Sequence, residues 1–386
     1  MNIGIDVFGC DHGRSGTGSY VLSLVKNLPR NNGCTYELFG PEIDRYTFDP
    51  GDGSVSYSGI QIPDSITAER LWHLFYLSRF AAKRKYDAVL FPAGSRVRHY
   101  TRKIPAVAVI HEVVSQEMAS QEMAFQEMAF DTGKVSVSAA WLKSFTSSLK
   151  KPAKIIAVSQ FIRKDLTAMN IKAEKIEVIY DGIDHSMFYP RPALSSDTVN
   201  IQPFAIKKPY IIYASRLSKP EKKHIELIRA FSLFKKKTGL PHRLVLAGSE
   251  DPYAESVHRE AASSEFACDI FITGYFPHKD FPELYSGSEA CIFPSVGEGV
   301  GLPLIEAMAS GLPVACAKAG SLPEIAGDCA LYFNPDDTEE CASAIEAVLT
   351  DTKLRERLIK SGFEWVKRFS WEKTAEKTIE LLQSLK

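Results

Sequence analysis

Residues 290–306 read ACIFPSVGEGVGLPLIE and contain an apolar run, a glycine-rich loop and the beginning of a helical pattern. The apolar run Ala290–Phe293 predicts a buried strand. Three glycines at alternate positions in the loop allow the backbone to turn tightly and to approach a ligand closely. Pro303 favours the first position of a helix, and Gly311 predicts where that helix ends. A strand, a glycine loop and a helix in this order are typical of a doubly wound α/β domain, whose ligands bind beyond the carboxyl ends of the strands.

Two carboxylates lie near the start of this helix, Glu298 in the glycine loop and Glu306 inside the helix. The free N–H groups and the dipole of a helix N-terminus favour an anion such as a diphosphate. Because carboxylates repel phosphate, we expect them to face neutral hydroxyl groups, one on a sugar and the other on a ribose. The alternatives are two solvated surface acids, or the paired carboxylates of a hydrolase, which would not need the glycine loop.

A basic segment follows the first apolar run of the second half of the chain. Residues 215–224 read SRLSKPEKKH, which places Arg216 after a predicted strand and Lys222 at a predicted helix start. Arginine presents a planar fork and lysine a compact charge, so the two cations together can neutralise a leaving diphosphate. A cation at a helix N-terminus opposes the helix dipole, which favours a functional reason for Lys222. The alternative is a solvated basic loop, the interpretation that we favour for Lys219 and Lys223.

The first half of the chain offers two weaker motifs. Residues 13–20 read GRSGTGSY after the first predicted strand, but they lack the Gly-Lys-Ser/Thr of a phosphate-binding P-loop. Gly16 therefore belongs either to a loop that approaches a phosphate or to a tight turn between strand and helix. His111 follows the apolar run Ala106–Ile110 and can hydrogen-bond a transferred sugar or pass a proton. A structurally satisfied histidine is the alternative.

Short apolar runs alternate with amphipathic stretches along the whole chain. Strands are predicted at 2–8, 36–39, 87–91, 106–110, 154–158 and 176–179, and then at 210–214, 243–247, 270–273, 290–293, 314–317 and 330–333. Helices are predicted at 18–28, 66–84, 137–150, 159–169, 222–237, 281–286, 303–310, 339–350, 354–368 and 371–385, with Ser159 as an N-cap. Residues 184–209 lose this periodicity and read as a linker. The sequence thus predicts two doubly wound α/β domains, 1–195 and 196–370, with the ligand site in a cleft between them.

Composition excludes several classes of protein. The net charge is −1, so the chain as a whole is not a nucleic-acid binder. Its seven cysteines form no Cys-x-x-Cys pair, which argues against a disulfide framework or a zinc site and favours a reducing cytoplasm. We see no signal-peptide pattern at the beginning of the chain and no apolar run of about 18 residues that would span a bilayer.

Two stretches of the first half have no settled interpretation. Gln-Glu-Met-Ala occurs three times between residues 116 and 129, either as a neutral duplication or as a mobile or membrane-touching segment. Eight basic residues lie near four aromatic ones, and they form either a solvated face or a peripheral contact with an anionic leaflet. These residues are Arg79, Lys83, Arg84, Lys85, Arg96, Arg98, Arg102 and Lys103, with Trp72, Phe75, Tyr76 and Phe80.

Taken together, these motifs resemble glycosyltransferase family 4, a large group of retaining enzymes with the GT-B fold, over almost the whole length. Glu298 and Glu306 fall on the family's E-x7-E motif, with Val300 in place of the usual Phe. Arg216 and Lys222 match its diphosphate-binding pair. Gly16 matches the glycine of its N-terminal loop. The segments at 158–161, 181–184 and 321–324 resemble further landmarks of the family.

The resemblance implies a role for each matched residue. Glu298 would contact the hydroxyls of the donor sugar, and Glu306 would bind the ribose. Arg216 and Lys222 would stabilise the leaving nucleotide diphosphate. His111 would position the sugar or assist catalysis, in a His-Glu pair where the family has His-Asp. The donor site would also include Gly16, Gly299, Val300, Gly301 and Leu302.

The resemblance also implies a reaction and partners. A hexose would pass, with retention of configuration, from a nucleotide sugar to a glycan or lipid-linked acceptor in cell-surface polysaccharide, lipopolysaccharide or glycolipid synthesis. We expect GDP-mannose first and a UDP-hexose second, with no metal and no cofactor. Residues 371–386 would form a helix that crosses back to the first domain. The alternatives are a GT-B nucleotide-sugar epimerase, a sugar phosphorylase, or an inactive nucleotide-sugar binding protein.

Overall fold

A computed structural model describes residues 1–30, 32–113, 146–192, 196–201 and 203–385. The chain forms two compact units, Met1–Gly182 together with Trp371–Lys386, and Ile183–Ser370. The Gln-Glu-Met-Ala repeat and most of the helix predicted at 137–150 lie outside the described residues. Within the described parts of the chain, no helix is both long enough and apolar enough to cross a membrane.

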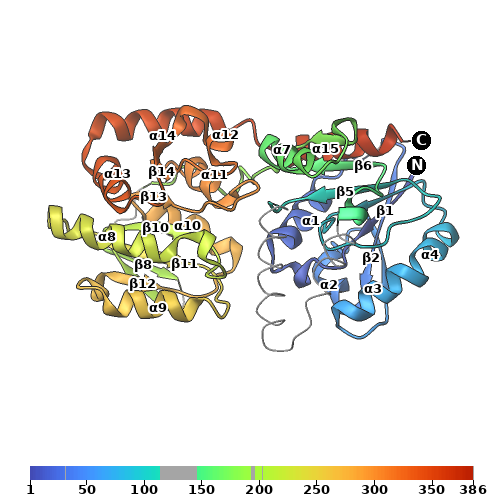
Figure 1. The fold of residues 1–386 in the computed structure, drawn as a ribbon, viewed down its shortest axis with the longest axis horizontal. Coiled ribbons are helices and arrows are strands. Elements are labelled where there is room, and N and C mark those ends of the chain that lie inside the picture. The colour runs from blue at the N-terminus through green and yellow to red at the C-terminus, as the bar shows by residue number, and fades with distance from the viewer. Residues whose placement is uncertain (31, 114–145, 193–195, 202, 386) are drawn as a thin grey trace. The chain divides into compact units, whose positions relative to one another are not determined.

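A parallel sheet of seven strands, in the order β3-β2-β1-β4-β5-β6-β7, forms the centre of the first unit (Figure 1). Every residue of β4 and β5 is buried, as expected for strands covered on both faces. The strands are β1 Asn2–Asp6, β2 Thr35–Pro41, β3 Ser56–Ile60, β4 Ala88–Phe91, β5 Ala106–Ile110, β6 Lys154–Ala157 and β7 Ile176–Val178. The helices are α1 Gly16–Lys26, α2 Arg45–Phe48, α3 Ile66–Phe75, α4 Leu77–Lys83, α7 Gln160–Ala168 and α15 Trp371–Gln383.

Local signals explain where two of these helices begin. The Ser159 side chain accepts a hydrogen bond from the N–H of Ile162 at the start of α7, which confirms the predicted N-cap. Ser15 caps α1 in the same way through the N–H of Gly18.

The single helix predicted at 66–84 is wrong, because the chain breaks it at Tyr76 into α3 and α4. Trp72 and Leu77 both pack into the same hydrophobic cluster. On one straight helix the two side chains would point about 140° apart. The break turns both side chains toward the core. Because no proline or glycine marks this break, the sequence pattern did not predict it.

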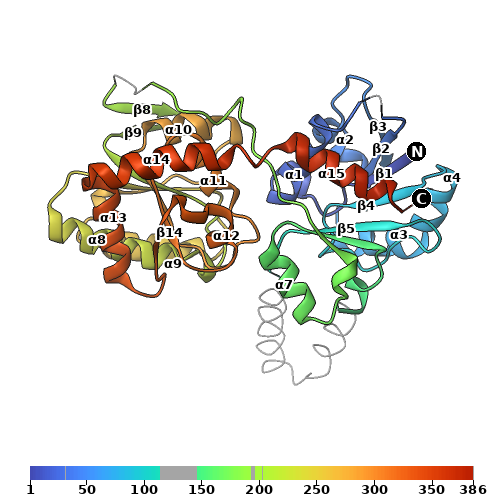
Figure 2. The same cartoon turned by 90° about the horizontal axis from the view of Figure 1, so that it is seen from above.

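The second unit contains a parallel sheet of six strands, in the order β12-β11-β10-β13-β14-β15, and a separate two-stranded hairpin. The strands of the sheet are β10 Tyr210–Ala214, β11 Arg243–Ala247, β12 Ile270–Ile272, β13 Ala290–Phe293, β14 Val314–Ala317 and β15 Leu331–Phe333. The helices are α8 His224–Thr238, α9 Ala254–Ser263, α10 Phe281–Gly287, α11 Leu302–Ala309, α12 Leu322–Ala326, α13 Thr338–Thr350 and α14 Thr352–Val366. Helix α13 packs on α8, α14 packs on α11, and Figure 2 shows these pairs on opposite faces of the sheet.

The segment between the sheets is more ordered than the predicted linker. It forms the antiparallel hairpin of β8 (Thr198–Ile201) and β9 (Phe204–Lys207), which belongs to the second unit. The first unit ends at Gly182 rather than at residue 195. The reason is that Ile183 pairs with Ser370, and Phe188 packs against the rings of His278 and Tyr285 in the second unit.

Helix α15 returns the chain to the first unit. The ring of Trp371 packs against Tyr20 of α1, with centroids 5.6 Å apart. The Thr374 hydroxyl donates to the carbonyl of Tyr180 at 2.7 Å.

Each sheet has one position where the strand order reverses direction. In the first unit this switch point lies between β1 and β4, and in the second between β10 and β13. In doubly wound folds, ligands bind at the carboxyl ends of the strands that flank a switch point. The topology therefore selects the loops that follow β1, β4, β10 and β13 as candidate sites.

Candidate functional site

The loops after β10 and β13 carry the basic segment and the glycine loop, and they meet at the switch point of the second unit. Ile211 and Ile212 of β10 lie beside Ala290 and Cys291 of β13. Beyond the strands, the N–H of Val296 donates to the carbonyl of Glu221 at 2.9 Å. The two motifs that the sequence separates by about 80 residues are thus neighbours.

Lys222 and Glu298 form the central contact of this site. Nζ of Lys222 lies 2.6 Å from Oε1 of Glu298, and the two side chains are only 21% and 14% exposed. Burial alone would raise the pKa of Glu298, but the ion pair with Lys222 outweighs it and holds this pKa below its usual value. Lys222 and Glu298 therefore neutralise each other.

Lys222 lies in a 3-10 turn, Pro220–Lys222, and not in the helix predicted to start there. The chain reverses at Lys223 in the left-handed conformation, and α8 begins only at His224. The Tyr213 hydroxyl donates to the carbonyl of Lys222 at 2.9 Å, which fixes the turn. The cation thus precedes the helix by two residues, and its position is set by the turn.

His224 is a buried neighbour of this ion pair that sequence reasoning did not select. Its ring packs against Tyr213 with centroids 4.8 Å apart. Burial, together with the charge of Lys222, lowers the pKa of His224 to about 4. The imidazole is therefore neutral at physiological pH and supports the site without adding charge.

The glycine loop is braced at both ends. Gly301 adopts φ +77° as the residue before α11, a conformation that favours glycine, and a Cβ there would approach Leu322 to 2.9 Å. The Ser321 hydroxyl donates to the carbonyl of Glu298 at 2.8 Å. Helix α11 begins at Leu302, so Pro303 takes its second position rather than the first. Gly299 and Val300 lie between Glu298 and this helix start.

Glu306 lies buried in α11 and has two partners that carry no sequence signal. Its Oε1 is 2.8 Å from Nε2 of His278, and its Oε2 accepts from the Tyr285 hydroxyl at 3.4 Å. Burial alone would lower the pKa of His278, but the pairing with Glu306 outweighs it and raises this pKa. The His278 side chain is half exposed, so a ligand can reach the pair.

Arg216 is exposed directly after β10, where the N–H of Ser215 still bonds to Ala247. Its backbone position is fixed while its guanidinium faces solvent. The structure thus brings Lys222 and Glu298 into contact, places Glu306 on the adjoining helix and leaves Arg216 at the rim of the same strand end.

Gly16 and His111 belong to the first unit. Gly16 is the first residue of α1, and a Cβ built on it meets no atom within 4 Å. Two residues on, a Cβ at Gly18 would lie 2.6 Å from the carbonyl of Cys10. Packing therefore requires glycine at 18 but not at 16.

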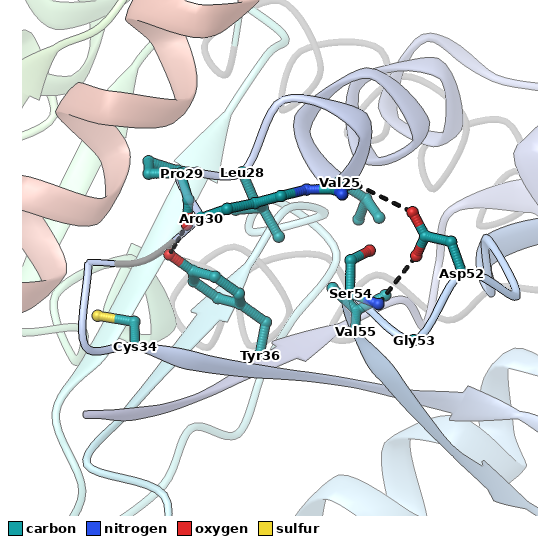
Figure 3. A pocket seen from close by; sticks show the side chains of 10 residues that line it. All are labelled: Val25, Leu28, Pro29, Arg30, Cys34, Tyr36, Asp52, Gly53, Ser54 and Val55. Atoms are coloured by element: carbon teal, nitrogen blue, oxygen red, sulfur yellow. Dashed lines mark hydrogen bonds and ion pairs between the residues drawn. The ribbon is translucent and has the colours of Figure 1, made fainter.

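A hollow in the first unit lies at the amino ends of β2 and β3 (Figure 3). Cys34 and Tyr36 at the start of β2 and Val55 before β3 line it, and the ion pair of Arg30 with Asp52 spans 3.0 Å at its side. Ligands of doubly wound sheets bind at the carboxyl ends of the strands, so we do not assign the site to this hollow. Among the described residues, no group of three His, Cys, Asp or Glu side chains could hold a metal ion.

Solved structures share this architecture over the whole chain. HepE of Anabaena in complex with UDP superposes with a TM-score of 0.72 and 18% identity, covering 99% of both chains. Sucrose-phosphate synthase of Thermosynechococcus elongatus also gives 0.72, with 21% identity over 100% of this chain and 99% of the other. The two Rossmann-like units therefore form a GT-B fold.

Sequence families match each unit in turn. "Glycosyltransferase Family 4" matches residues 14–187, and "Glycosyl transferases group 1" matches residues 197–365. The chain belongs to glycosyltransferase family 4.

Curated relatives match part of the chain. O-antigen chain mannosyltransferase B of Escherichia coli is 31% identical over 61% of this chain and 62% of its own length. Sulfoquinovosyl transferase SQD2 of Arabidopsis thaliana is 28% identical over 55% of this chain and 41% of its own length. O-antigen chain mannosyltransferase RfbU of Salmonella typhimurium is 28% identical over 52% of each chain. The matches span less than two thirds of the length of each relative.

Proposed function

We propose that this chain is a retaining glycosyltransferase that moves a hexose from a nucleotide diphosphate sugar to a glycan or lipid-linked acceptor in polysaccharide synthesis. The observation that carries the proposal is the contact between Lys222 and Glu298 at the switch point of the second sheet. Family membership and the O-antigen mannosyltransferases among the relatives support it.

The ion pair defines the first step of donor binding. The diphosphate takes over Lys222 and meets the exposed Arg216, while Glu298 is released toward the hydroxyls of the sugar. The N–H groups at the start of α11 face the same anion. Glu306, already bonded to His278, accepts from the ribose hydroxyls. Each group then meets the charge or dipole that complements it.

The two cations also supply the catalytic effect. When the glycosidic bond to phosphate breaks, negative charge grows on the leaving diphosphate, and Arg216 and Lys222 stabilise it more strongly than they stabilise the bound donor. The acceptor hydroxyl attacks the face from which the phosphate departs and gives its proton to the leaving phosphate oxygen, which retains configuration. The cations carry out this stabilisation without a metal.

We propose GDP-mannose as the first donor to test, because several relatives are named mannosyltransferases. A UDP-hexose is the second, since HepE holds UDP in a similar fold. The test is release of nucleotide diphosphate from GDP-mannose, UDP-glucose and ADP-glucose, with product anomers identified by NMR. Release together with an α-linked product supports the proposal. Epimerised nucleotide sugar, phosphorolysis or binding without release would refute it.

We further propose that helix α3 makes the peripheral contact with the membrane that a lipid-linked acceptor requires. Ile66, Leu71, Leu74 and Phe75 of α3 are exposed, and so is Tyr76 directly after it. Arg70 of the same helix is also exposed. Helices that lie on an anionic leaflet combine exposed apolar and aromatic side chains with basic ones.

Four of the twelve residues that the sequence suggested for such a contact have partners within the first unit. Trp72 is buried and Phe80 packs against the core. Arg84 pairs with Glu37, and Arg96 with Asp11. These four side chains are therefore engaged within the unit.

Sedimentation with phosphatidylcholine vesicles, with and without phosphatidylglycerol, tests the contact. We expect binding only to the anionic vesicles and its loss in the double variant Leu74→Ser, Phe75→Ser. The matched control is Tyr46→Ser, which removes an exposed aromatic side chain from α2. Equal binding of anionic vesicles by the double variant and the wild type would show that α3 does not make the membrane contact.

A further inference from the structure

A cluster of buried polar atoms surrounds His111 in the first unit. Nδ1 of His111 lies 3.7 Å from Oδ2 of Asp181, which follows β7 and is almost fully buried. The ring of Tyr20 from α1 packs edge-on against the imidazole, with centroids 4.7 Å apart. Three chain segments far apart in sequence thus meet at the end of β5.

Three polar atoms of this cluster have no hydrogen-bond partner among the described residues. They are Nε2 of His111, Oδ1 of Asp181 and the hydroxyl of Tyr20. Buried polar groups in proteins are nearly always paired, so each exception needs an explanation, of which a catalytic role is one. The Tyr20 hydroxyl lies near Thr378, so the two atoms that are left for a polar ligand group are Nε2 of His111 and Oδ1 of Asp181.

We infer that Asp181 is a positioning residue for His111, which it holds with Nδ1–H directed at its carboxylate so that Nε2 is left for a hydroxyl of the transferred sugar. The inference rests on the proposed function for the identity of that hydroxyl. The pairing itself depends only on the first unit.

Charge supports this arrangement. Burial alone would lower the pKa of His111, but Asp181 outweighs it, and Glu112 adds to the effect, so that the pKa is raised. The carbonyl of Pro92 raises this pKa further, and the Tyr20 ring beside the imidazole carries a hydroxyl whose pKa is raised by burial, so that it stays neutral. Glu112 is held by the Ser95 hydroxyl at 2.7 Å. The imidazolium form is thus favoured, and its Nε2–H can donate to a sugar oxygen.

The separation of 3.7 Å is longer than a hydrogen bond, so the two groups are held as an ion pair when the imidazole is protonated. Catalytic hydrogen bonds are often long in unliganded enzymes and tighten when substrate binds. Asp181 immediately precedes Gly182, the last residue of the first unit before the chain enters the second. The carboxylate therefore lies at the point where the chain leaves the unit.

The test is an NMR titration of the full chain with labelled histidine, in which the His111 signal is assigned by its loss in His111→Gln. We expect a wild-type midpoint above about 6.5, and a midpoint lower by about one pH unit or more in Asp181→Asn. The matched control is Glu177→Gln, which removes an exposed carboxylate from β7 and should leave the midpoint unchanged. A wild-type midpoint below the ordinary value, or no change in Asp181→Asn, would overturn the pairing. The wild-type result decides even if the variant does not fold.

Kinetics test the positioning role separately. With the donor that wild-type enzyme turns over, Asp181→Asn should lower kcat about tenfold or more, since a shift of one pKa unit changes the imidazolium fraction tenfold above the midpoint. The donor KM should change little, and the alkaline limb of the pH profile should move to lower pH. If the NMR midpoint of His111 falls in Asp181→Asn but the alkaline limb of the pH–rate profile does not move, the imidazolium form of His111 is not used in the reaction. Wild-type protein that turns over no donor would refute the proposed function, and the NMR result would still decide the pairing.

Discussion

Replacement of Lys222 by alanine tests the stability and the catalytic role of the donor site in one variant. In the free protein, Lys222→Ala leaves the buried carboxylate of Glu298 without its partner. In the proposed reaction it also removes one of two cations from the leaving diphosphate. The two consequences have different sizes and are measured independently.

The stability effect follows from the geometry of the pair. The two charged atoms are 2.6 Å apart on side chains that are mostly buried. Two unit charges at this distance attract by roughly 6 kcal/mol at an effective dielectric constant of about 20, before desolvation is counted. Desolvation consumes most of this attraction, whereas a buried charge that loses its partner costs about 3 kcal/mol. We expect Lys222→Ala to lower the free energy of unfolding by about 2–3 kcal/mol at neutral pH.

The pH dependence of this loss has a defined sign. The pKa of Glu298 is lowered in the folded protein, so its pairing contributes stability above the unfolded value of about 4.3. That contribution disappears as pH falls through the folded pKa. In Lys222→Ala, burial raises the pKa of Glu298, and the carboxylate takes up a proton in mild acid. The difference in melting temperature between variant and wild type should therefore shrink as pH falls.

Release of nucleotide diphosphate measures the catalytic effect. Loss of one preorganised group that stabilises transition-state charge lowers kcat by roughly 100- to 1,000-fold. The control is Lys219→Ala, which removes an exposed cation three residues upstream and should change kcat by no more than about twofold. Turnover by Lys222→Ala within about threefold of wild type would refute the role of this cation. An unchanged melting temperature would refute the claim that the ion pair of Lys222 with Glu298 stabilises the fold.

Four further results are expected. Glu298→Gln should bind GDP or UDP at least as tightly as wild type by calorimetry, because its lysine partner is released, while transfer is lost; weaker binding would count against the ion-pair exchange. His278→Gln should lower the melting temperature near pH 6 and have little effect near pH 9. The reason is that the protonated imidazole, whose pKa is raised in the folded protein, stabilises the fold below about pH 6.5, and this contribution is lost as pH rises through the folded pKa. An equal loss at both pH values would mean that the charge pairing of His278 with Glu306 contributes nothing. Gly16→Ala should leave the melting temperature unchanged and reduce donor turnover. Gly18→Ala should destabilise the first unit, since a Cβ at position 18, unlike one at position 16, meets backbone atoms. A lower melting temperature in Gly16→Ala with unchanged turnover would refute the hypothesis that Gly16 allows a ligand to approach. Treatment with a chelator should leave turnover unchanged, and a loss that magnesium restores would show that a metal takes part.

The sequence by itself determined the class of fold and the principal motif residues. Strands such as Ala106–Ile110 are apolar on successive residues because both faces of a parallel sheet are covered, and this composition can be read locally. The glycine loop with Glu298, followed by the helix that contains Glu306, is also a local signal, because a tight backbone turn requires glycines at consecutive or alternate positions. The N-cap at Ser159 was predictable for the same reason.

Only the tertiary structure decided which of these groups touch. Lys222 meets Glu298 because β10 and β13 are neighbours in the sheet, and strand order is set by long-range packing that no single segment encodes. His278 and Asp181 have no local signal, since their importance lies in a partner more than 25 residues away, Glu306 and His111 respectively. The break at Tyr76 likewise follows from the core that Trp72 and Leu77 share. Periodicity reports which face of an element is buried, but the chemistry of a site depends on distances between elements, and those exist only in the folded chain.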